Sequence, residues 1–92
     1  MSFDDEVRSR IDANASNREL CDAADRFMRA STQPKYSYNF SWLGRPVIQY
    51  PQDIVAMQEL IWQVRPDLIV ETGIAHGGSL ILSASMLALI DY

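Results

Sequence analysis

The chain has 92 residues, of which 48% are hydrophobic and 22% are charged, and its formal net charge is −4 at pH 7. This length and composition are typical of a small folded domain and argue against a disordered or fibrous protein. The acidic balance and the eight scattered Lys and Arg residues lack the basic footprint of a nucleic-acid-binding protein, so we expect no nucleic-acid partner.

The single cysteine, Cys21, allows no disulfide bond within the chain, which fits a reducing cytoplasm, and we expect a cytoplasmic protein. Because Cys21 lies in a predicted helix, we interpret it as a small packing residue rather than a reactive thiol. Residues 1–6 are acidic and lack the apolar core of a signal peptide. The longest apolar stretch, residues 80–90, is shorter than the roughly 20 residues of a membrane span, so no transmembrane segment is expected.

The first third of the chain has helical signals. Three acidic residues follow Ser2, and carboxylates favour the positive end of a helix dipole. Ser16, with Glu19 three positions later, predicts a capping box that opens a second helix. The apolar residues that follow at helical spacing are Leu20, Ala24, Phe27 and Met28. Because Pro34 disfavours helical geometry at the preceding residue, we expect residues 1–34 to form an N-terminal helical segment.

From residue 35 the sequence period changes to two. Four aromatic residues alternate with polar ones, which predicts an extended segment with one aromatic face; they are Tyr36, Tyr38, Phe40 and Trp42. Such a face is more often core or subunit contact than a ligand cage. A turn is predicted at residues 44–46. Pro51 suits a first helical position, and Pro66 ends the predicted helix, whose apolar face carries Ile54, Met57, Leu60, Ile61 and Val64.

The last third predicts the opening of an α/β domain. Residues 68–70 are continuously apolar, which predicts a parallel strand covered on both faces. Residues 79–89 are apolar nearly all round, which predicts a buried helix. The order helix, strand, glycine loop, helix is typical of a Rossmann-like, doubly wound domain. A parallel strand needs a second strand after a crossover, so we expect residues 35–92 to be an incomplete, truncated start of such a domain.

The glycine loop between strand and helix carries the candidate ligand chemistry. A glycine just past a strand, Gly73, permits a sharp turn and a close approach of ligand to backbone. Gly77 and Gly78 open the next helix, whose free N–H groups can hold a carboxylate or phosphate. Ser79 either hydrogen-bonds that anion or caps the helix. Glu71, beside an apolar strand, needs a partner, which is either a ligand's ammonium group or the loop amides.

The spacing of this loop differs from two common nucleotide motifs. Ala75 occupies the place of the second glycine in the dinucleotide fingerprint, and the lysine of a phosphate P-loop is absent. A glycine turn without any ligand stays open as the alternative. His76 is the only histidine, and metal sites need several convergent ligands, so we interpret it as a loop-tip residue rather than a base or metal ligand. No catalytic residue and no metal ligand is assigned.

Residues 71–79 have the spacing E-x-G-x-x-x-G-x-S, which resembles the first motif of catechol-type O-methyltransferases, whose loop holds the methionine end of S-adenosylmethionine. Together with the flanking segments 35–44 and 49–53, this motif looks like the cephalosporin hydroxylase/rhamnosyl O-methyltransferase family. The resemblance covers about residues 35–92. It implies a Rossmann-like methyltransferase domain that binds S-adenosylmethionine through Glu71, Gly73, Gly77, Gly78 and Ser79.

The resemblance also implies a reaction and its partners. Full-length relatives are expected to methylate a hydroxyl of a sugar, glycolipid or secondary metabolite in lipid or antibiotic biosynthesis. Some also bind a divalent metal, often magnesium, through residues that would lie beyond this chain, and a full-length protein could form a homo-oligomer. Two alternatives stay open: a β-lactam hydroxylase or methoxylation component, and a non-catalytic truncated remnant. The 92-residue chain is expected to be inactive alone.

Overall fold

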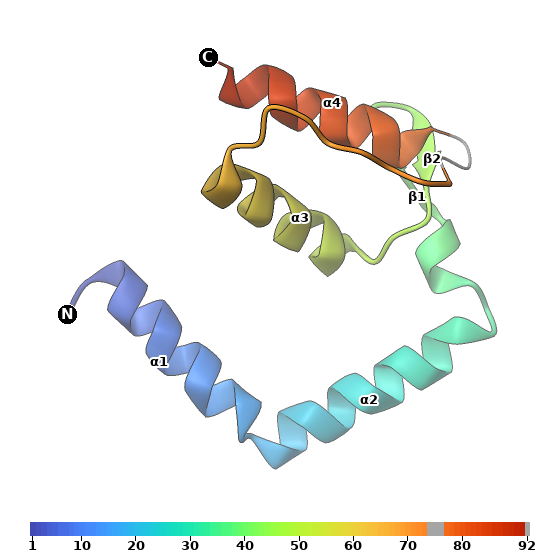
Figure 1. Ribbon diagram of the computed structural model, residues 1–92. Coiled ribbons are helices and arrows are strands. Elements are labelled where there is room, and N and C mark those ends of the chain that lie inside the picture. Colours follow the sequence, from blue (N-terminus) through green and yellow to red (C-terminus); the bar gives the residue numbers. More distant parts are fainter. Residues whose placement is uncertain (74–76, 92) are drawn as a thin grey trace. The chain divides into compact units, whose positions relative to one another are not determined.

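The structure, a computed structural model, describes residues 1–73 and 77–91 (Figure 1). The chain divides into two compact units, Met1–Pro34 and Lys35–Tyr92. The elements of the first unit are α1 (Phe3–Ala15) and α2 (Arg18–Thr32). Those of the second are the 3-10 helix η1 (Tyr36–Tyr38), β1 (Phe40–Trp42), β2 (Arg45–Val47), α3 (Pro51–Val64) and α4 (Gly78–Ile90).

Helix α1 begins with a complete capping box. The Asp5 N–H donates to the Ser2 hydroxyl oxygen at 3.2 Å, and the Ser2 N–H donates to the Asp5 carboxylate at 3.3 Å. Two N–H groups that no helical carbonyl can reach are satisfied in this way. The acidic start of the chain therefore fixes the beginning of α1, as its sequence predicts.

Helix α2 begins one residue later than the sequence pattern predicts. Asn17 is its N-cap, and the side-chain oxygen of Asn17 accepts the Leu20 N–H at 3.0 Å. Ser16 instead ends α1, where its hydroxyl donates to the Ala13 carbonyl at 3.3 Å. The predicted capping box of Ser16 and Glu19 is therefore wrong, because asparagine caps as well as serine and the serine is used by the preceding helix.

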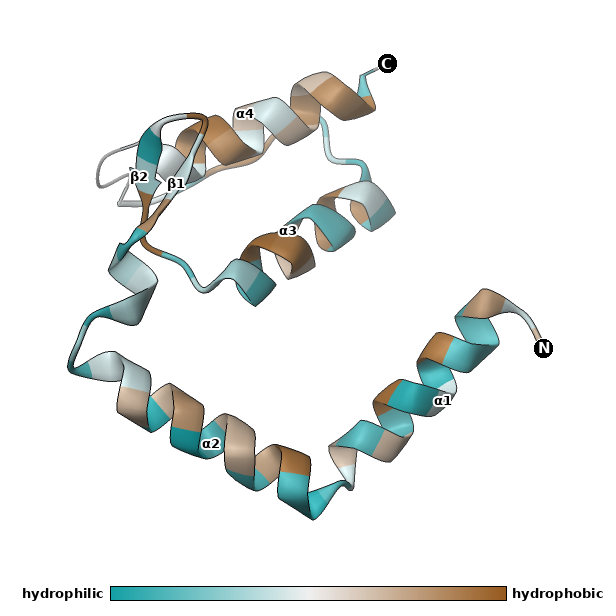
Figure 2. Cartoon of the chain, turned by 180° about the vertical axis from the view of Figure 1, so that it is seen from behind, coloured by the Kyte–Doolittle hydropathy of each residue, from teal (hydrophilic) through white to brown (hydrophobic). Residues whose placement is uncertain are grey.

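The first unit has no buried hydrophobic side chain among its described residues. The predicted apolar stripe on α2 is half-exposed at its larger members, Leu20, Phe27 and Met28. Figure 2 shows apolar and polar residues alternating along this helix. Within α2, Asp25 and Arg29 form an exposed ion pair at 2.7 Å.

The second unit opens with a short helix where an extended segment was expected. Tyr36–Tyr38 is a 3-10 helix, so the extended prediction is wrong there and holds only for β1. The Asn39 amide donates to the carbonyls of Lys35, at 2.9 Å, and Tyr36, at 3.2 Å. These local bonds favour a turn over an extended chain, which the alternating pattern of aromatic residues cannot reveal.

Strands β1 and β2 form an antiparallel hairpin in which Trp42 pairs with Arg45. Leu43 and Gly44 make the two-residue loop, with φ values of 48° and 82°. Positive φ at both positions is what a type I′ turn requires, and its twist matches that of the strands. The turn therefore precedes the predicted position at residues 44–46, and Pro46 lies within β2.

Helix α3 begins with Pro51 at its first position, as predicted, and ends at Arg65 in a left-handed conformation. The Arg65 N–H donates to the Ile61 carbonyl at 2.7 Å and closes the last turn. Helices α3 and α4 contact each other and run in the same direction, and residues 65–73 carry the chain back between their ends (Figure 1).

The small core of the second unit lies where the hairpin, α3 and α4 meet. Its buried hydrophobic residues are Val47, Ile61 and Leu82, which are 2%, 5% and 3% exposed. A Cβ on Gly78 would lie 2.1 Å from the Pro46 carbonyl oxygen, so only glycine lets β2 approach the first turn of α4 this closely. The Trp42 indole N–H donates to the Ser85 hydroxyl at 3.2 Å and joins β1 to the same helix.

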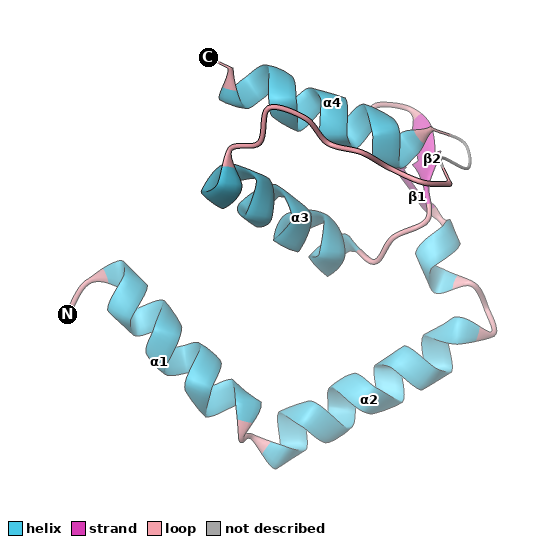
Figure 3. Cartoon of the chain, viewed as in Figure 1, coloured by secondary structure: helices cyan, strands magenta, loops and turns pink. Residues whose placement is uncertain are grey.

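The predicted parallel strand is wrong for this structure. Residues 68–70 are a loop (Figure 3), and Leu68 and Val70 are 75% and 79% exposed. A strand exists only when a neighbour completes its hydrogen bonds, and the strands of the described chain, β1 and β2, pair with each other. The described fold is therefore mostly helical with one antiparallel hairpin rather than a parallel sheet.

Helix α4 is also less buried than its sequence predicts. Its buried residues are Gly78, Leu82 and Ser83, whereas Leu80 and Leu89 are exposed. Within the described residues, contacts from the hairpin and α3 cover only part of its surface. An all-round apolar helix needs cover on every side, and these elements supply it on some sides only.

Candidate functional site

A cavity of about 420 Å³ lies where four parts of the chain converge. They are the hairpin exit, which we define as residues 46–49, helix α3, residues 71–73 and the start of α4. Three of the five predicted cofactor-binding residues line it, namely Glu71, Gly73 and Ser79. The other lining residues are Pro46, Ile48, Gln49, Met57 and Thr72. The two ends of the glycine-loop motif therefore lie on one side of the cavity, and residues of the hairpin exit form another side, the hairpin wall.

The carboxylate of Glu71 is the most unusual group in this cavity. The Ser79 hydroxyl donates to its Oε1 atom at 2.5 Å. Its Oε2 atom is buried and has no hydrogen-bond partner among the described residues. A buried carboxylate oxygen without a donor is costly, so this atom is suited to receive an N–H donor from a bound molecule.

The contact with Glu71 also defines what Ser79 can do. A hydroxyl has one hydrogen, and Ser79 directs it to Glu71, so it cannot donate to a ligand carboxylate at the same time. Ser79 is the second residue of α4 and provides no side-chain cap. In this geometry its role is to hold the Glu71 carboxylate in place.

The three predicted glycines have different structural reasons to be glycine. Gly73 and Gly77 have φ values of 74° and 84°, and a Cβ at either position would meet nothing within 4 Å. Glycine adopts this left-handed backbone conformation without strain, and the absence of a side chain leaves open space beside it. Gly78 is buried against β2, so glycine is needed there because a Cβ would collide with the Pro46 backbone. Gly77 and Gly78 are not among the residues that line the cavity.

Helix α4 begins beside this cavity, which Ser79 of its first turn lines. The Ile81 N–H donates to the Gly77 carbonyl at 3.0 Å, and Gly77 provides no side-chain cap. The N–H groups at the start of a helix have no intrahelical partner and carry a partial positive charge. This end of α4 therefore favours a negatively charged group. His76 and Ala75 lie outside the described residues.

A second, smaller cavity of about 140 Å³ adjoins the first, since both are lined by Gln49, Met57 and Ser79. Its remaining lining comes from α3 and α4 and is mostly apolar; it comprises Asp53, Ile54, Ala56, Leu60 and Leu82. The sequence patterns did not assign Gln49, Met57 or Thr72 to the ligand site. Thr72 lies inside the glycine-loop motif, and Gln49 lies two residues before the predicted helix start at Pro51. These two positions in the sequence are the signal that could have identified them.

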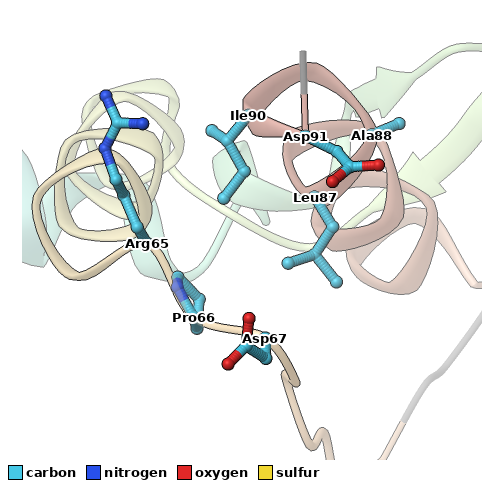
Figure 4. A pocket seen from close by; sticks show the side chains of 7 residues that line it. All are labelled: Arg65, Pro66, Asp67, Leu87, Ala88, Ile90 and Asp91. Atoms are coloured by element: carbon cyan, nitrogen blue, oxygen red, sulfur yellow. The ribbon is translucent and has the colours of Figure 1, made fainter.

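A further cavity, of about 400 Å³, lies at the other ends of α3 and α4 and contains none of the predicted residues (Figure 4). Asp67 and Asp91 line it, and the Arg65 side chain points away from Asp67. The Arg65 guanidinium instead lies 3.9 Å from the centre of the Trp62 ring. Across residues 1–73 and 77–91, no three His, Cys, Asp or Glu side chains gather closely enough to hold a metal ion.

A cavity with a buried carboxylate oxygen beside a glycine in a left-handed conformation is typical of a small-molecule pocket. The chain belongs to the Rhamnosyl O-methyltransferase/CmcI family, whose model matches residues 34–92, and this confirms the family resemblance of the sequence. Searches of curated proteins and of solved structures gave no match. None of the described helices has both the length and the apolar character needed to cross a membrane.

Proposed function

We propose that residues 35–92 supply part of the S-adenosylmethionine site of an O-methyltransferase that acts on a hydroxyl of a sugar, glycolipid or secondary metabolite. Membership of the Rhamnosyl O-methyltransferase/CmcI family implies methyl transfer from this cofactor. The observation that supports the site assignment is the unpartnered Oε2 atom of Glu71 in the cavity beside Gly73.

The residues present fit the amino-acid end of the cofactor. Its ammonium group is the kind of donor that the Glu71 oxygen lacks, and a charged pair of this kind is among the stronger hydrogen bonds. Its carboxylate suits the positive end of α4. The open left-handed turn at Gly73 gives ligand access to the backbone. When bound, S-adenosylmethionine supplies a methyl group on a positively charged sulfur atom.

The same charges argue against a nicotinamide dinucleotide. A pyrophosphate beside Glu71 would meet a carboxylate that is held in position by Ser79. Like charges a few ångströms apart repel, and the repulsion is stronger in a partly buried site than in water. The proposed cofactor instead offers an ammonium and a sulfonium group to this carboxylate.

The test is calorimetric titration of S-adenosylhomocysteine into the native polypeptide that carries this sequence. We expect binding, and about a tenfold loss of affinity in Glu71→Gln, since a hydrogen bond to a charged group is lost. Glu59→Gln makes the same charge change on an exposed position of α3 and should leave affinity unchanged. Tighter binding of NAD or NADP than of S-adenosylmethionine would overturn the proposal.

A further inference from the structure

Gln49 occupies the wall of the candidate site that faces the glycine-loop motif. It is half-buried and lines both the larger cavity and the smaller one that adjoins it. It comes from the hairpin exit, whereas Glu71 and Gly73 come from the segment before α4. A ligand in the larger cavity is therefore bordered by Gln49 from one segment and by Glu71 from another.

The Gln49 backbone is held in place by contacts outside the cavity. Its N–H donates to the Ser37 carbonyl at 3.1 Å. The hairpin that leads to it is joined to α4 through the Trp42 hydrogen bond and the close approach of Pro46 to Gly78. The side-chain amide of Gln49, in contrast, belongs to the lining of the cavity. A half-buried amide on a fixed backbone is preorganised to bind a ligand group.

Among the polar side chains of the cavity, the Gln49 amide can act as a hydrogen-bond donor to a ligand. Glu71 can only accept hydrogen bonds, and the Ser79 hydrogen is directed to Glu71. Thr72 is exposed and follows Glu71 directly, so it lies on the same segment as the carboxylate. Gln49 is the side chain on the hairpin wall that can donate N–H groups into the cavity.

We infer that Gln49 is a specificity-determining residue that binds the carboxylate of the ligand whose ammonium group contacts Glu71; this inference rests on the proposed function. In an α-amino acid end, the ammonium and the carboxylate are attached to one carbon atom. A site that binds both groups needs a hydrogen-bond acceptor for the ammonium and a donor for the carboxylate, placed on different sides of that carbon. Glu71 and Gln49 form such a pair beside the positive end of α4, which favours the same carboxylate, and together they select a zwitterionic amino-acid end over a simple amine.

The experiment combines two ligands with three variants of the native polypeptide that carries this sequence. The ligands are S-adenosylhomocysteine and its decarboxylated analogue, which keeps the amine and lacks the carboxylate. Gln49→Met removes the amide at nearly constant size, and Gln49→Glu replaces it with a repelling carboxylate. Gln52→Glu makes the same charge change on an exposed position of α3 and is the matched control.

We expect Gln49→Met to weaken S-adenosylhomocysteine about tenfold and Gln49→Glu to weaken it more, since the lost bond is to a charged group. Affinity for the decarboxylated analogue should stay within about twofold of wild type in Gln49→Met and in the control. In Gln49→Glu this affinity should not fall, since the analogue has no carboxylate to be repelled. A purely structural role would weaken both ligands equally, and this result would overturn the inference, as would unchanged affinity for both. If Gln49→Glu does not fold, Gln49→Met decides alone. Absence of any S-adenosylhomocysteine binding to wild type would instead refute the proposed function.

Discussion

The two units of the chain are stabilised in different ways. In Met1–Pro34 side-chain caps begin both helices, an exposed ion pair lies within α2, and no described hydrophobic side chain is buried. In Lys35–Tyr92 a hairpin, two helices and the segment between them enclose Val47, Ile61 and Leu82. Helices of the length of α1 and α2 are marginal in water without tertiary packing. Substitutions in the second unit should therefore cost more than equivalent ones in the first.

The largest expected effect is that of Leu82→Ala in the core of the second unit. We expect the free energy of unfolding to fall by about 3 kcal/mol, because the substitution removes buried methyl groups and leaves a cavity. Leu20→Ala, at a half-exposed position of α2, should cost less than about 1 kcal/mol. Urea unfolding followed by circular dichroism and by tryptophan fluorescence measures both. Equal costs would contradict the comparison.

Gly78→Ala should destabilise the same unit by at least about 2 kcal/mol, because its Cβ would collide with the Pro46 backbone and force the hairpin away from α4. Gly44→Ala is the matched control, since a Cβ there meets nothing within 4 Å and the cost is only that of a left-handed alanine, about 1 kcal/mol. The same urea titration ranks the two variants. A smaller loss in Gly78→Ala than in Gly44→Ala would show that this close approach does not stabilise the unit.

In the first unit, Asn17→Ala should have a local effect of about 1 kcal/mol, because it removes the N-cap of α2. The affected group is the Leu20 N–H, whose hydrogen exchange should accelerate about fivefold at that energy. Asn14→Ala, a change of the same kind at an exposed position of α1, should leave this rate unchanged. Nuclear magnetic resonance measures the exchange, and an equal acceleration in both variants would exclude a capping role.

The smallest effect is expected for the ion pair of Asp25 and Arg29, whose side chains are both exposed. A double-mutant cycle with Asp25→Ala and Arg29→Ala should give a coupling energy of at most about 0.5 kcal/mol. High salt should reduce this coupling further, because exposed charges are screened. Thermal unfolding followed by circular dichroism provides the energies. A coupling above 1 kcal/mol would mean that the first unit is more tightly packed than its exposed surface indicates.

Helices were predictable from the sequence because their signals are local. Pro51 marks the start of α3, and the apolar run at residues 79–89 lies within α4. The strand predicted at residues 68–70 is a loop in the structure, since an apolar run becomes a strand only beside another strand. The short helix at Tyr36–Tyr38 depends on the side chain of Asn39, which the alternating aromatic pattern conceals.

The candidate site was predictable in part. The motif spacing selected Glu71, Gly73 and Ser79, which the structure places around one cavity. The hydrogen bond of Ser79 to Glu71 was not predictable, because the sequence leaves the direction of the hydroxyl open. The packing role of Gly78 depends on a carbonyl from β2, and no local pattern relates the two. Ligand binding by the five predicted residues stays a prediction.

The exposed loop at residues 68–70 has a consequence for the behaviour of the chain in solution. An apolar segment with unpaired backbone groups is a template for association with a second copy. Its two ends, however, are acidic, with Asp67 before it and Glu71 after it. In an antiparallel pairing of two copies centred on Ile69, Asp67 of one copy would lie opposite Glu71 of the other, and like charges in that position are destabilising. The acidic residues at the two ends of the segment thus disfavour the symmetric dimer.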